Sequence, residues 1–299
     1  MGTPLVQIET VLRPQPRPAW LKVRLASGDN YHELKRTMRG LGLHTVCESA
    51  RCPNIGECWE HRTATFMILG GQCTRRCAFC AVPKGRPMAV EWDEPERVAR
   101  AAETMGLRYI VVTSVDRDDL KDGGATVFAH TIAALRQRIP GCKVEVLIPD
   151  FRGSDAALGI VLGAGPDVLN HNIETVPRLY SVARRGSRYE RSLRLLARSR
   201  EIEPSIPTKS GLMVGLGETF GELLAVLGDL SAAGVEIATI GQYLRPSRDQ
   251  LPVARYYTPE EFATLKHEGE HLGIRHVESG PLVRSSYHAH KQSRSIVAL

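Results

Sequence analysis

The 299-residue sequence has no long apolar run, and no stretch approaches the ~20 residues that a membrane-spanning helix needs. An apolar signal segment is also missing from its start. The net charge is +6, but no expected strand or helix interleaves basic with aromatic side chains as a nucleic-acid stacking platform does. We therefore expect a cytoplasmic protein with no membrane and no nucleic-acid partner. The charge leaves an acidic protein or an anionic small molecule open as a partner.

Cysteine is concentrated in one part of the chain. Six of the seven cysteines lie within 34 residues and form a first triplet (Cys47, Cys52, Cys58) and a second triplet (Cys73, Cys77, Cys80). The second triplet places three thiolates on one tight loop, where they can bind three irons of a four-iron, four-sulfur cluster and leave one iron without a protein ligand. The first triplet lies on another short loop, which Pro53 and Gly56 turn. The pattern predicts two clusters.

Disulfides and structural zinc account for the cysteines less well. A disulfide framework is typical of small secreted domains, not of a chain this long. Structural zinc usually takes four ligands in two separated pairs, which two triplets do not supply. So many free thiols indicate a reducing compartment. The seventh cysteine, Cys142, stands alone before a strand-like run, and we expect a buried, unreactive thiol there.

From residue 65 onward, apolar runs alternate with helical patterns, which predicts a parallel sheet covered by helices. The expected strands are 66–69, 108–113, 144–148, 167–173, 211–214 and 237–241, and the expected helices are 94–105, 126–138, 154–162, 189–201, 218–233 and 259–272. Six units are fewer than the eight of a closed barrel, and a doubly wound sheet is the alternative. Polar residues follow every strand, as they do at the active-site end of barrels, so we predict an α/β fold with a partial (β/α)6 parallel barrel.

The residues before this barrel predict an arm laid on it. A helix is expected over 30–40, capped by Asp29 or Asn30, and the loop of the first triplet follows it.

One strand end is unusually polar. The run from Asn170 to Glu174 puts four polar side chains at the end of a buried strand, where each needs a partner. A bound polar ligand would supply those partners; for His171 the alternative is a core histidine with partners of its own. The glycines at 211, 215 and 217 lack the spacing of a dinucleotide fingerprint, but they would let a ligand approach the backbone.

These motifs together resemble a known family. The loop CTRRCAFC resembles the signature of the radical S-adenosylmethionine enzymes, and the first triplet resembles the second-cluster motif of the lipoyl synthases within that superfamily. Similar segments follow in family order along nearly the whole chain: CPNIGECW, TATFMILG, TSVDRDDL, DGGA, LNHNIET, PTKSGLMVGLGET, GQYLRPS and GPLVRSSYHA. Arg185 and Arg245 stand where some relatives have proline and glutamine, which puts fine contacts of the ligand pocket in doubt.

The resemblance implies a sulfurtransferase that inserts two sulfur atoms at carbons 6 and 8 of an octanoyl chain linked to a lysine of a carrier domain. The second triplet would hold the [4Fe–4S] cluster that binds and cleaves S-adenosylmethionine, because acid–base side chains cannot open an unactivated C–H bond. The first triplet would hold a second [4Fe–4S] cluster, the sulfur source. Its fourth ligand would be a serine, Ser286 in preference to Ser285.

The resemblance also implies contacts to S-adenosylmethionine. Phe79 would flank the adenine, and Gln242 and Leu244 would line the adenine side. The methionine and ribose portions would be held by Ser114, Asp116, Asn172, Glu174 and Arg184. For each of these residues, a purely structural role at a strand end is the alternative.

The implied organisation is an arm over 1–64, a partial barrel over 65–278 and a tail over 279–299 that folds over the barrel mouth and supplies the serine. The implied partners are octanoylated lipoyl-carrier domains, namely E2 subunits of 2-oxoacid dehydrogenases and the glycine cleavage H protein. An electron donor such as ferredoxin or flavodoxin and a cluster-repair protein are implied as well. A biotin-synthase-like or methylthio-transferring enzyme, which would place its second-cluster ligands elsewhere, and a two-cluster electron carrier, which would be far shorter, are the alternatives.

Overall fold

The computed structural model describes residues 16–22, 28–61, 64–289 and 292. Parts of the expected arm (1–15, 23–27, 62–63) and of the expected tail (290–291, 293–299) lie outside the described residues. Among the residues that are described, no helix combines the length and the apolar character that crossing a membrane would require.

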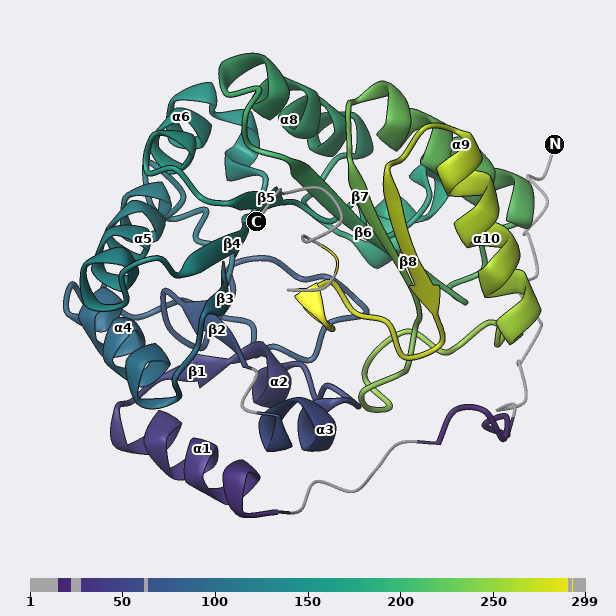
Figure 1. The fold of residues 1–299 in the computed structure, drawn as a ribbon. Helices are drawn as coiled ribbons and strands as arrows, with labels where there is room; N and C mark the ends of the chain where they lie inside the picture. Colours follow the sequence, from purple (N-terminus) through teal and green to yellow (C-terminus); the bar gives the residue numbers. More distant parts are fainter. Residues whose placement is uncertain (1–15, 23–27, 62–63, 290–291, 293–299) are drawn as a thin grey trace, which may run out of the picture.

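The described residues form one open sheet of eight strands that follow one another in chain order (Figure 1). The strands are β1 (His44–Thr45), β2 (Thr65–Ile68), β3 (Tyr109–Ser114), β4 (Lys143–Leu147), β5 (Val168–Asn170), β6 (Thr208–Val214), β7 (Ile237–Gln242) and β8 (His276–Gly280). β2 to β8 run parallel, and β1 pairs antiparallel with β2. The prediction of a partial parallel barrel is confirmed.

Helices cover the outer face of the curved sheet, one after each of the strands β2 to β7 (Figure 1). They are α4 (Glu94–Thr104), α5 (Ala125–Arg138), α6 (Asp155–Gly163), α8 (Tyr189–Ile202), α9 (Phe220–Ala232) and α10 (Pro259–His271), with the short η1 (Phe151–Gly153), η2 (Pro177–Leu179) and α7 (Tyr180–Ala183) in the loops. Each expected helix is found within two residues of its expected ends. Ser154, Thr219 and Thr258 cap α6, α9 and α10 by accepting backbone hydrogen bonds.

Two strand expectations were wrong in extent, and a further parallel strand was missed. β5 ends at Asn170, because the polar run after it leaves the sheet ladder, and β6 begins at Thr208, three residues earlier than expected. β8 was not expected at all. It has only one buried residue, Val277, so its sequence lacks the apolar run that marks the other strands. β8 spans the expected boundary at residue 278.

The arm packs on the barrel through α1 (Asp29–Gly40), α2 (Val46–Ser49) and α3 (Ile55–Glu60). Leu34, Met38 and Trp59 are fully buried and belong to the same apolar cluster as the outer faces of β2 to β4. The expected cap of α1 was wrong: Gly28 holds the N-cap position, and the Asn30 side chain instead donates to the Glu60 carbonyl at 2.8 Å. That bond joins the start of α1 to the end of α3.

A polar layer closes the barrel interior below its mouth, which we define as the edge formed by the C-terminal ends of β2 to β7. Lys209 and Glu145 are both fully buried and form an ion pair at 2.9 Å. Tyr109 and Asn170 donate to the same carboxylate at 2.7 and 3.1 Å. Because a buried charge is tolerated when it is paired and hydrogen-bonded, this layer forms a stable floor under the mouth.

Candidate functional site

A cavity of about 340 Å³ opens above this floor, at the mouth of the barrel. Its walls come from the two cysteine loops, the ends of β3 to β7 and the tail. Five of the six triplet cysteines line it, all except Cys58. The other expected site residues also line it, namely Phe79, Ser114, Asp116, Asn172, Glu174, Arg184, Gln242, Leu244, Ser285 and Ser286. Residues from positions 47 to 286 thus meet in one space.

The loop of the second triplet starts from a tight turn after β2. Leu69 has a left-handed backbone (φ 69°), and the buried Glu94 carboxylate accepts its N–H at 2.7 Å. Cys73 then pairs with the backbone near Lys84, and Thr74 bonds the Asp116 carbonyl through both its N–H and its hydroxyl. The loop is therefore fastened to the end of β3 and cannot be displaced without breaking several hydrogen bonds.

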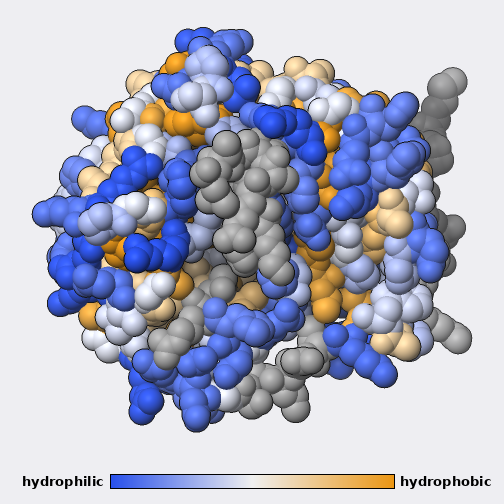
Figure 2. Space-filling view, viewed as in Figure 1, coloured by the Kyte–Doolittle hydropathy of each residue, from blue (hydrophilic) through white to orange (hydrophobic). Residues whose placement is uncertain are grey.

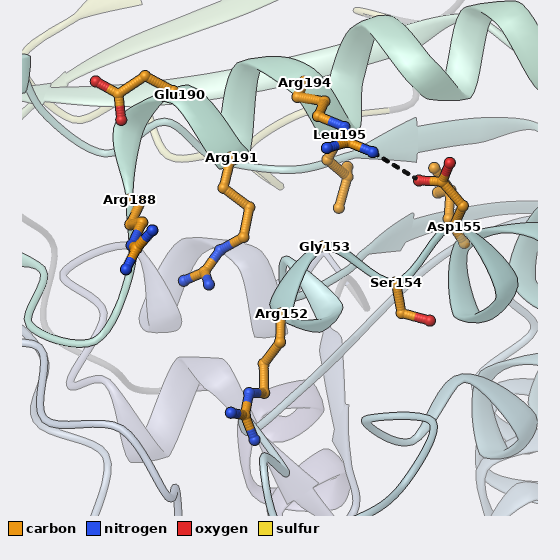
Figure 3. Close-up of a pocket in the computed structure, with 10 residues that line it drawn as sticks. Arg152, Gly153, Ser154, Asp155, Arg188, Glu190, Arg191, Arg194 and Leu195 are labelled. Carbon is orange, nitrogen blue, oxygen red and sulfur yellow. Dashed lines mark ion pairs between the residues drawn. The ribbon is translucent and has the colours of Figure 1, made fainter.

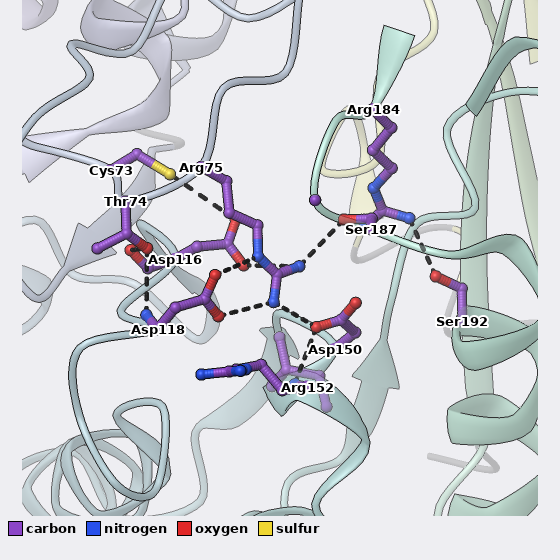
Figure 4. Close-up of polar contacts among 12 residues, drawn as sticks. Cys73, Thr74, Arg75, Asp116, Asp118, Asp150, Arg152, Arg184, Ser187 and Ser192 are labelled. Carbon is purple, nitrogen blue, oxygen red and sulfur yellow. Dashed lines mark hydrogen bonds and ion pairs between the residues drawn. The ribbon is translucent and has the colours of Figure 1, made fainter. Parts of the chain in front are cut away.

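Arg75, inside the second triplet, is the centre of a buried ion network (Figure 4). Its guanidinium holds Asp118 in a bidentate pair with both N···O distances at 2.8 Å, contacts Asp150 at 2.5 Å and lies 3.3 Å from Asp116. It also donates to the Ser187 hydroxyl at 3.0 Å. Asp150 is completely buried, and these arginine contacts hold its pKa well below the usual range. The network ties the cysteine loop to the ends of β3 and β4.

The thiols of both triplets are protonated in the absence of a bound cation. Burial raises the pKa of Cys77 to about 12, although Arg184 nearby lowers it. Burial also raises the pKa of Cys58 to about 12, and the neighbouring Cys47 and Cys52 add to this rise. Electrostatic coupling of Cys58 to two other thiols means that the first triplet converges. Buried thiolates need a compensating positive charge, which metal ions supply when they bind.

The polar residues around the second triplet leave hydrogen-bonding capacity for a ligand. The Ser114 hydroxyl is buried and has no hydrogen-bond partner within the described part of the chain. Asn172 donates to Glu174 at 3.1 Å, and Glu174 takes a left-handed backbone (φ 69°). Burial raises the pKa of Glu174, while Arg184 lowers it. Asp116 is similarly placed, with its pKa raised by burial and lowered by Arg75. A zwitterionic ligand with hydroxyl groups suits such a set.

Two of the polar residues are committed to the fold. Gln242 donates to the carbonyls of Val214, Tyr243 and Arg255 and accepts from the Tyr257 N–H, so its amide fixes the loop after β7. His171 is fully buried, with Ile148 O at 2.8 Å and Ser192 Oγ at 2.9 Å from its ring nitrogens. Burial lowers the pKa of His171 to about 3, so the ring is neutral. His171 is the core histidine that the sequence left open as an alternative.

The first triplet lies on α2, on the turn that follows it and on α3. Thr45 caps α2 by accepting the Glu48 N–H, and Cys47 is buried and lines the cavity. Cys52 follows in a turn in which its N–H bonds the Cys47 carbonyl at 3.0 Å. Cys58 lies on α3, one turn after Asn54. Short helices thus bring the three thiols together without any strand pairing.

The C-terminal tail reaches the loop of the first triplet across the barrel mouth (Figure 1). Asn54 donates to the Leu282 carbonyl at 2.7 Å, and Tyr287 donates to Glu57 at 3.0 Å. The tail sits directly on the strand ends: a methyl group at Gly241 would lie 2.1 Å from the Val283 carbonyl oxygen. The positive charge of Arg284 lowers the pKa of Cys52, although burial raises it overall. The described part of the tail therefore folds over the mouth.

The two adjacent serines of the tail face different neighbours. Ser285 donates to the Asn172 side chain at 2.9 Å, and a methyl group at Gly211 would lie 2.8 Å from its hydroxyl. Ser286 lines the cavity, and its hydroxyl makes no hydrogen bond to any described residue. Of the two hydroxyls, that of Ser286 is thus the one without a partner among the described residues.

The donor set fits clusters better than single ions. A single zinc ion with Zn–S bonds of about 2.3 Å needs its sulfurs within about 4 Å of one another. Within the described ranges, no group of three or more His, Cys, Asp or Glu side chains is arranged to hold a single metal ion. Each triplet instead offers three separate thiols on a short segment, and each iron of a cluster can take one of them. The residues present fit two iron–sulfur clusters. Cys142 is buried against Leu135, as expected, and takes no part.

Sequence reasoning missed two site residues and placed two others too near the cavity. Arg75 and Arg284 both line the cavity, but nothing in the pattern distinguished them from the many other arginines. Arg185 is exposed, and Arg245 bonds the loop carbonyls of Arg248 and Gln250; neither lines the cavity. The departures from the family pattern at these two positions do not touch the ligand space.

Comparison with known proteins agrees with this site. A family model described as the radical SAM superfamily matches residues 67–230, which places the chain in that class. The solved structure of methylornithine synthase (PylB) has the same fold, with a TM-score of 0.53 over 71% of this chain and 69% of that chain at 12% identity.

A narrower match follows from the sequence. A family model for the N-terminal domain of lipoyl synthase matches residues 9–52. The chain is 62% identical to a lipoyl synthase of Koribacter versatilis, over 99% of this chain and 97% of the relative. It is 61% identical to that of Rubrobacter xylanophilus, over 93% and 86%. The chain belongs to the lipoyl synthase family, and the resemblance inferred from its motifs is confirmed. Enzymes of this family use a [4Fe–4S] cluster, S-adenosylmethionine and an auxiliary cluster.

Proposed function

We propose that this chain inserts two sulfur atoms at carbons 6 and 8 of an octanoyl chain that is amide-linked to a lysine of a lipoyl-carrier protein. The observation that carries the proposal is the convergence of five of the six triplet cysteines and a tail serine on one cavity above the polar floor. In this proposal, the barrel over 65–278 supplies part of the site, and the arm over 1–64 and the tail over 279–299 supply the rest.

The second triplet is assigned to the cluster that binds S-adenosylmethionine, and the first triplet with Ser286 to the auxiliary cluster. When bound, these groups supply the radical that opens the C–H bonds and the sulfur that replaces the hydrogens. Ser286 is preferred to Ser285 because the Ser285 hydroxyl already donates to Asn172.

The protein's own side chains bind and orient the cofactor. Arg184, held by the Asn172 carbonyl at 2.8 Å and by Tyr180 and Ser192 at 3.1 Å, presents a fixed positive charge toward a carboxylate. Glu174 and Asp116 present carboxyl oxygens toward an ammonium group, and the unpartnered Ser114 hydroxyl can serve a ribose. Phe79 and Leu244 provide apolar walls for the adenine. Gln242 contributes indirectly, because it shapes the cavity wall beside Phe79 and Leu244.

The tail excludes water from the reaction. Val283 packs directly on Gly241 near the end of β7, and Ser285 packs on Gly211 within β6, so the tail covers the mouth on the side of the first triplet. A radical formed in the cavity would otherwise meet solvent. The partners beyond the carrier protein, an electron donor such as ferredoxin or flavodoxin and a cluster-repair protein, remain part of the proposal, as does a cytoplasmic location.

The test is anaerobic incubation of the reconstituted protein with S-adenosylmethionine, a reductant and an octanoyl-lysine peptide, followed by mass analysis. We expect a peptide that carries two added sulfur atoms, with 5′-deoxyadenosine as co-product. Formation of 5′-deoxyadenosine with no sulfur in the peptide would contradict the proposal.

A further inference from the structure

A second pocket, of about 390 Å³, lies between the start of α6 and the start of α8 (Figure 3). We call it the rim pocket. Helices that follow parallel strands begin at the C-terminal edge of the sheet, so the rim pocket opens on the same side of the barrel as the central cavity. Hydrophilic side chains cover much of this side, including the region of α8 at the top of the view (Figure 2).

Four arginines line the rim pocket, together with two carboxylates, Asp155 and Glu190; the arginines are Arg152, Arg188, Arg191 and Arg194. Two of the arginines have acidic partners: Arg191 pairs with Asp150 at 2.8 Å, and Arg194 lies 4.0 Å from Asp155. The guanidinium groups of Arg152 and Arg188 make no hydrogen bond or ion pair with described residues, and both residues are exposed. The pocket thus presents two available positive charges.

The backbone around Arg152 is strained in a way that fixes its position. Phe151 and Arg152 both take left-handed conformations, with φ of 44° and 55°. Such a conformation is unfavourable for a residue other than glycine and persists only where the surroundings hold it. Here the buried Asp150 carboxylate holds it by accepting the Arg152 N–H at 3.0 Å. Arg152 lines the pocket, and its side chain extends from the loop before α6 away from Arg188 and Arg191 (Figure 3).

Asp150 also connects the rim pocket with the central cavity. One of its oxygens contacts Arg191 of the rim pocket, and the other contacts Arg75 of the second triplet's loop. Ion pairs through this one buried carboxylate therefore link a wall of the rim pocket with a wall of the central cavity.

We propose that the rim pocket is a docking site for an acidic surface patch of the lipoyl-carrier protein, whose carboxylates contact Arg152 and Arg188. The proposal rests on the proposed function, since it takes the octanoyl chain to be carried by a folded protein that must lie across the mouth. Charges at the edge of such an interface guide the partner and fix its orientation.

The wall chemistry favours a protein over a small anion. Asp155 is already paired with Arg198 at 3.0 Å, but Glu190 would repel a compact polyanion such as phosphate that entered the pocket. A protein surface can instead direct its acidic side chains to Arg152 and Arg188 and a basic one to Glu190.

The test is direct binding of octanoylated glycine cleavage H protein to the reconstituted enzyme, measured at low salt and in high salt. In the Arg152→Glu/Arg188→Glu variant we expect Kd to rise about tenfold or more at low salt, and the difference from wild type to shrink in high salt because rim charges are screened. The matched control is Arg100→Glu/Arg108→Glu, which makes the same charge change at exposed positions on α4 and at the opposite edge of the barrel. We expect its Kd to stay within about twofold of wild type.

Several outcomes would overturn the docking proposal. Equal weakening by the rim and control variants would show a general charge effect. An unchanged Kd in the rim variant would show that the carrier docks elsewhere. Inorganic phosphate that binds the wild type but not the rim variant, with H-protein binding kept, would make the pocket a small-anion site.

Further measurements distinguish a loss of docking from a loss of folding or of activity. Melting temperature and iron content are compared between the variants, and Arg152→Gln/Arg188→Gln replaces the charge reversal if that variant folds poorly. Wild-type turnover of a short octanoyl-lysine peptide is measured in parallel. Its failure would count against the proposed function, whereas a failure of docking alone leaves that turnover intact.

Discussion

The two cysteine triplets are adjacent to one cavity, yet the protein holds them by different means. The loop of the second triplet is locked by a buried arginine with three acidic partners and by backbone bonds to β3. The loop of the first triplet lies on two short helices and is covered by a tail that contacts it through a few hydrogen bonds. One site is built into the barrel, and the other is assembled from the two ends of the chain.

This difference matches the roles proposed for the two sites. A cluster that must cleave S-adenosylmethionine repeatedly needs a fixed geometry, which a buried ion network supplies. A cluster that gives up its sulfur must be released and replaced, and a site closed by a separable segment allows both. Regions with few buried contacts open locally at a lower free-energy cost than core strands do.

The largest expected effect separates the triplets by function. Cys77→Ala should abolish 5′-deoxyadenosine formation, because the second triplet loses one of its three thiols. Cys52→Ala should leave that cleavage largely intact while no sulfur enters the peptide. Both products are measured by mass spectrometry on anaerobically reconstituted protein. Equal loss of cleavage in the two variants would contradict the division of roles.

Adjacent serines provide the next test. Ser286→Ala should keep S-adenosylmethionine cleavage and lose the doubly sulfurated product, because the first triplet would lack its oxygen ligand. Ser285→Ala is the matched control. It removes one hydrogen bond, to Asn172, and we expect only a partial decrease in turnover. Ser286→Cys should bind iron and hold the cluster too firmly to release sulfur. Full product formation by Ser286→Ala would exclude this serine as a ligand.

A pair of adjacent arginines tests the rigidity of the second site. Arg75→Met removes the cation from a buried network, and we expect a loss of about 3 kcal/mol in the free energy of unfolding, since Asp150 keeps Arg191 as a partner. Arg76→Met changes the exposed neighbour and should cost about 0.5 kcal/mol or less. Denaturant unfolding of the apoprotein measures both.

The iron content gives a readout that a general loss of stability would not produce. In the Arg75→Met protein, iron should be lost from the second triplet in preference to the first, as judged with Cys52→Ala as background. Similar unfolding free energies for the Arg75 and Arg76 variants would mean that the network does not stabilise the loop.

The smallest effect concerns the tail. Tyr287→Phe removes the hydrogen bond to Glu57 and should reduce the local stability of the tail by about 1 kcal/mol. Amide hydrogen exchange should then be faster around α3 and residues 282–289, with no change in the loop of the second triplet. Faster exchange in both loops would show that the two sites open together.

Much of this arrangement could be predicted from the sequence. The barrel was predictable because each of the parallel strands β2 to β7, which are largely buried, contains an apolar run. β8 could not be predicted, because it is mostly polar and so lacks the apolar run that indicates a strand in the sequence. The spacing of the cysteine triplets made them recognisable as site residues, because disulfides and structural zinc account for such groups less well. The predicted fold of the tail over the mouth depended on the family resemblance, and the described residues show its contacts.

Residues that act through long-range contacts could not be predicted in this way. Arg75 and Arg76 are adjacent arginines in the same loop, and only the three-dimensional structure shows that one is buried among three carboxylates and the other is exposed. Gln242 was expected to line the adenine side, and it does line the cavity, but its amide is occupied by backbone groups of the loop that follows β7. The ion-pair or hydrogen-bond partner that a side chain takes is set by tertiary packing, and it leaves no local pattern in the sequence.

The protein holds the second triplet more firmly than the first, and the most direct test of this difference is to measure the alkylation of each cysteine after one turnover. Reconstituted enzyme is given a single equivalent of octanoyl-lysine peptide, then alkylated and digested, and each cysteine is scored by mass spectrometry. We predict that Cys47, Cys52 and Cys58 become alkylated in proportion to the product formed, whereas Cys73, Cys77 and Cys80 stay protected. Alkylation of the second triplet to the same extent, or protection of the first in protein that has made product, would contradict the account.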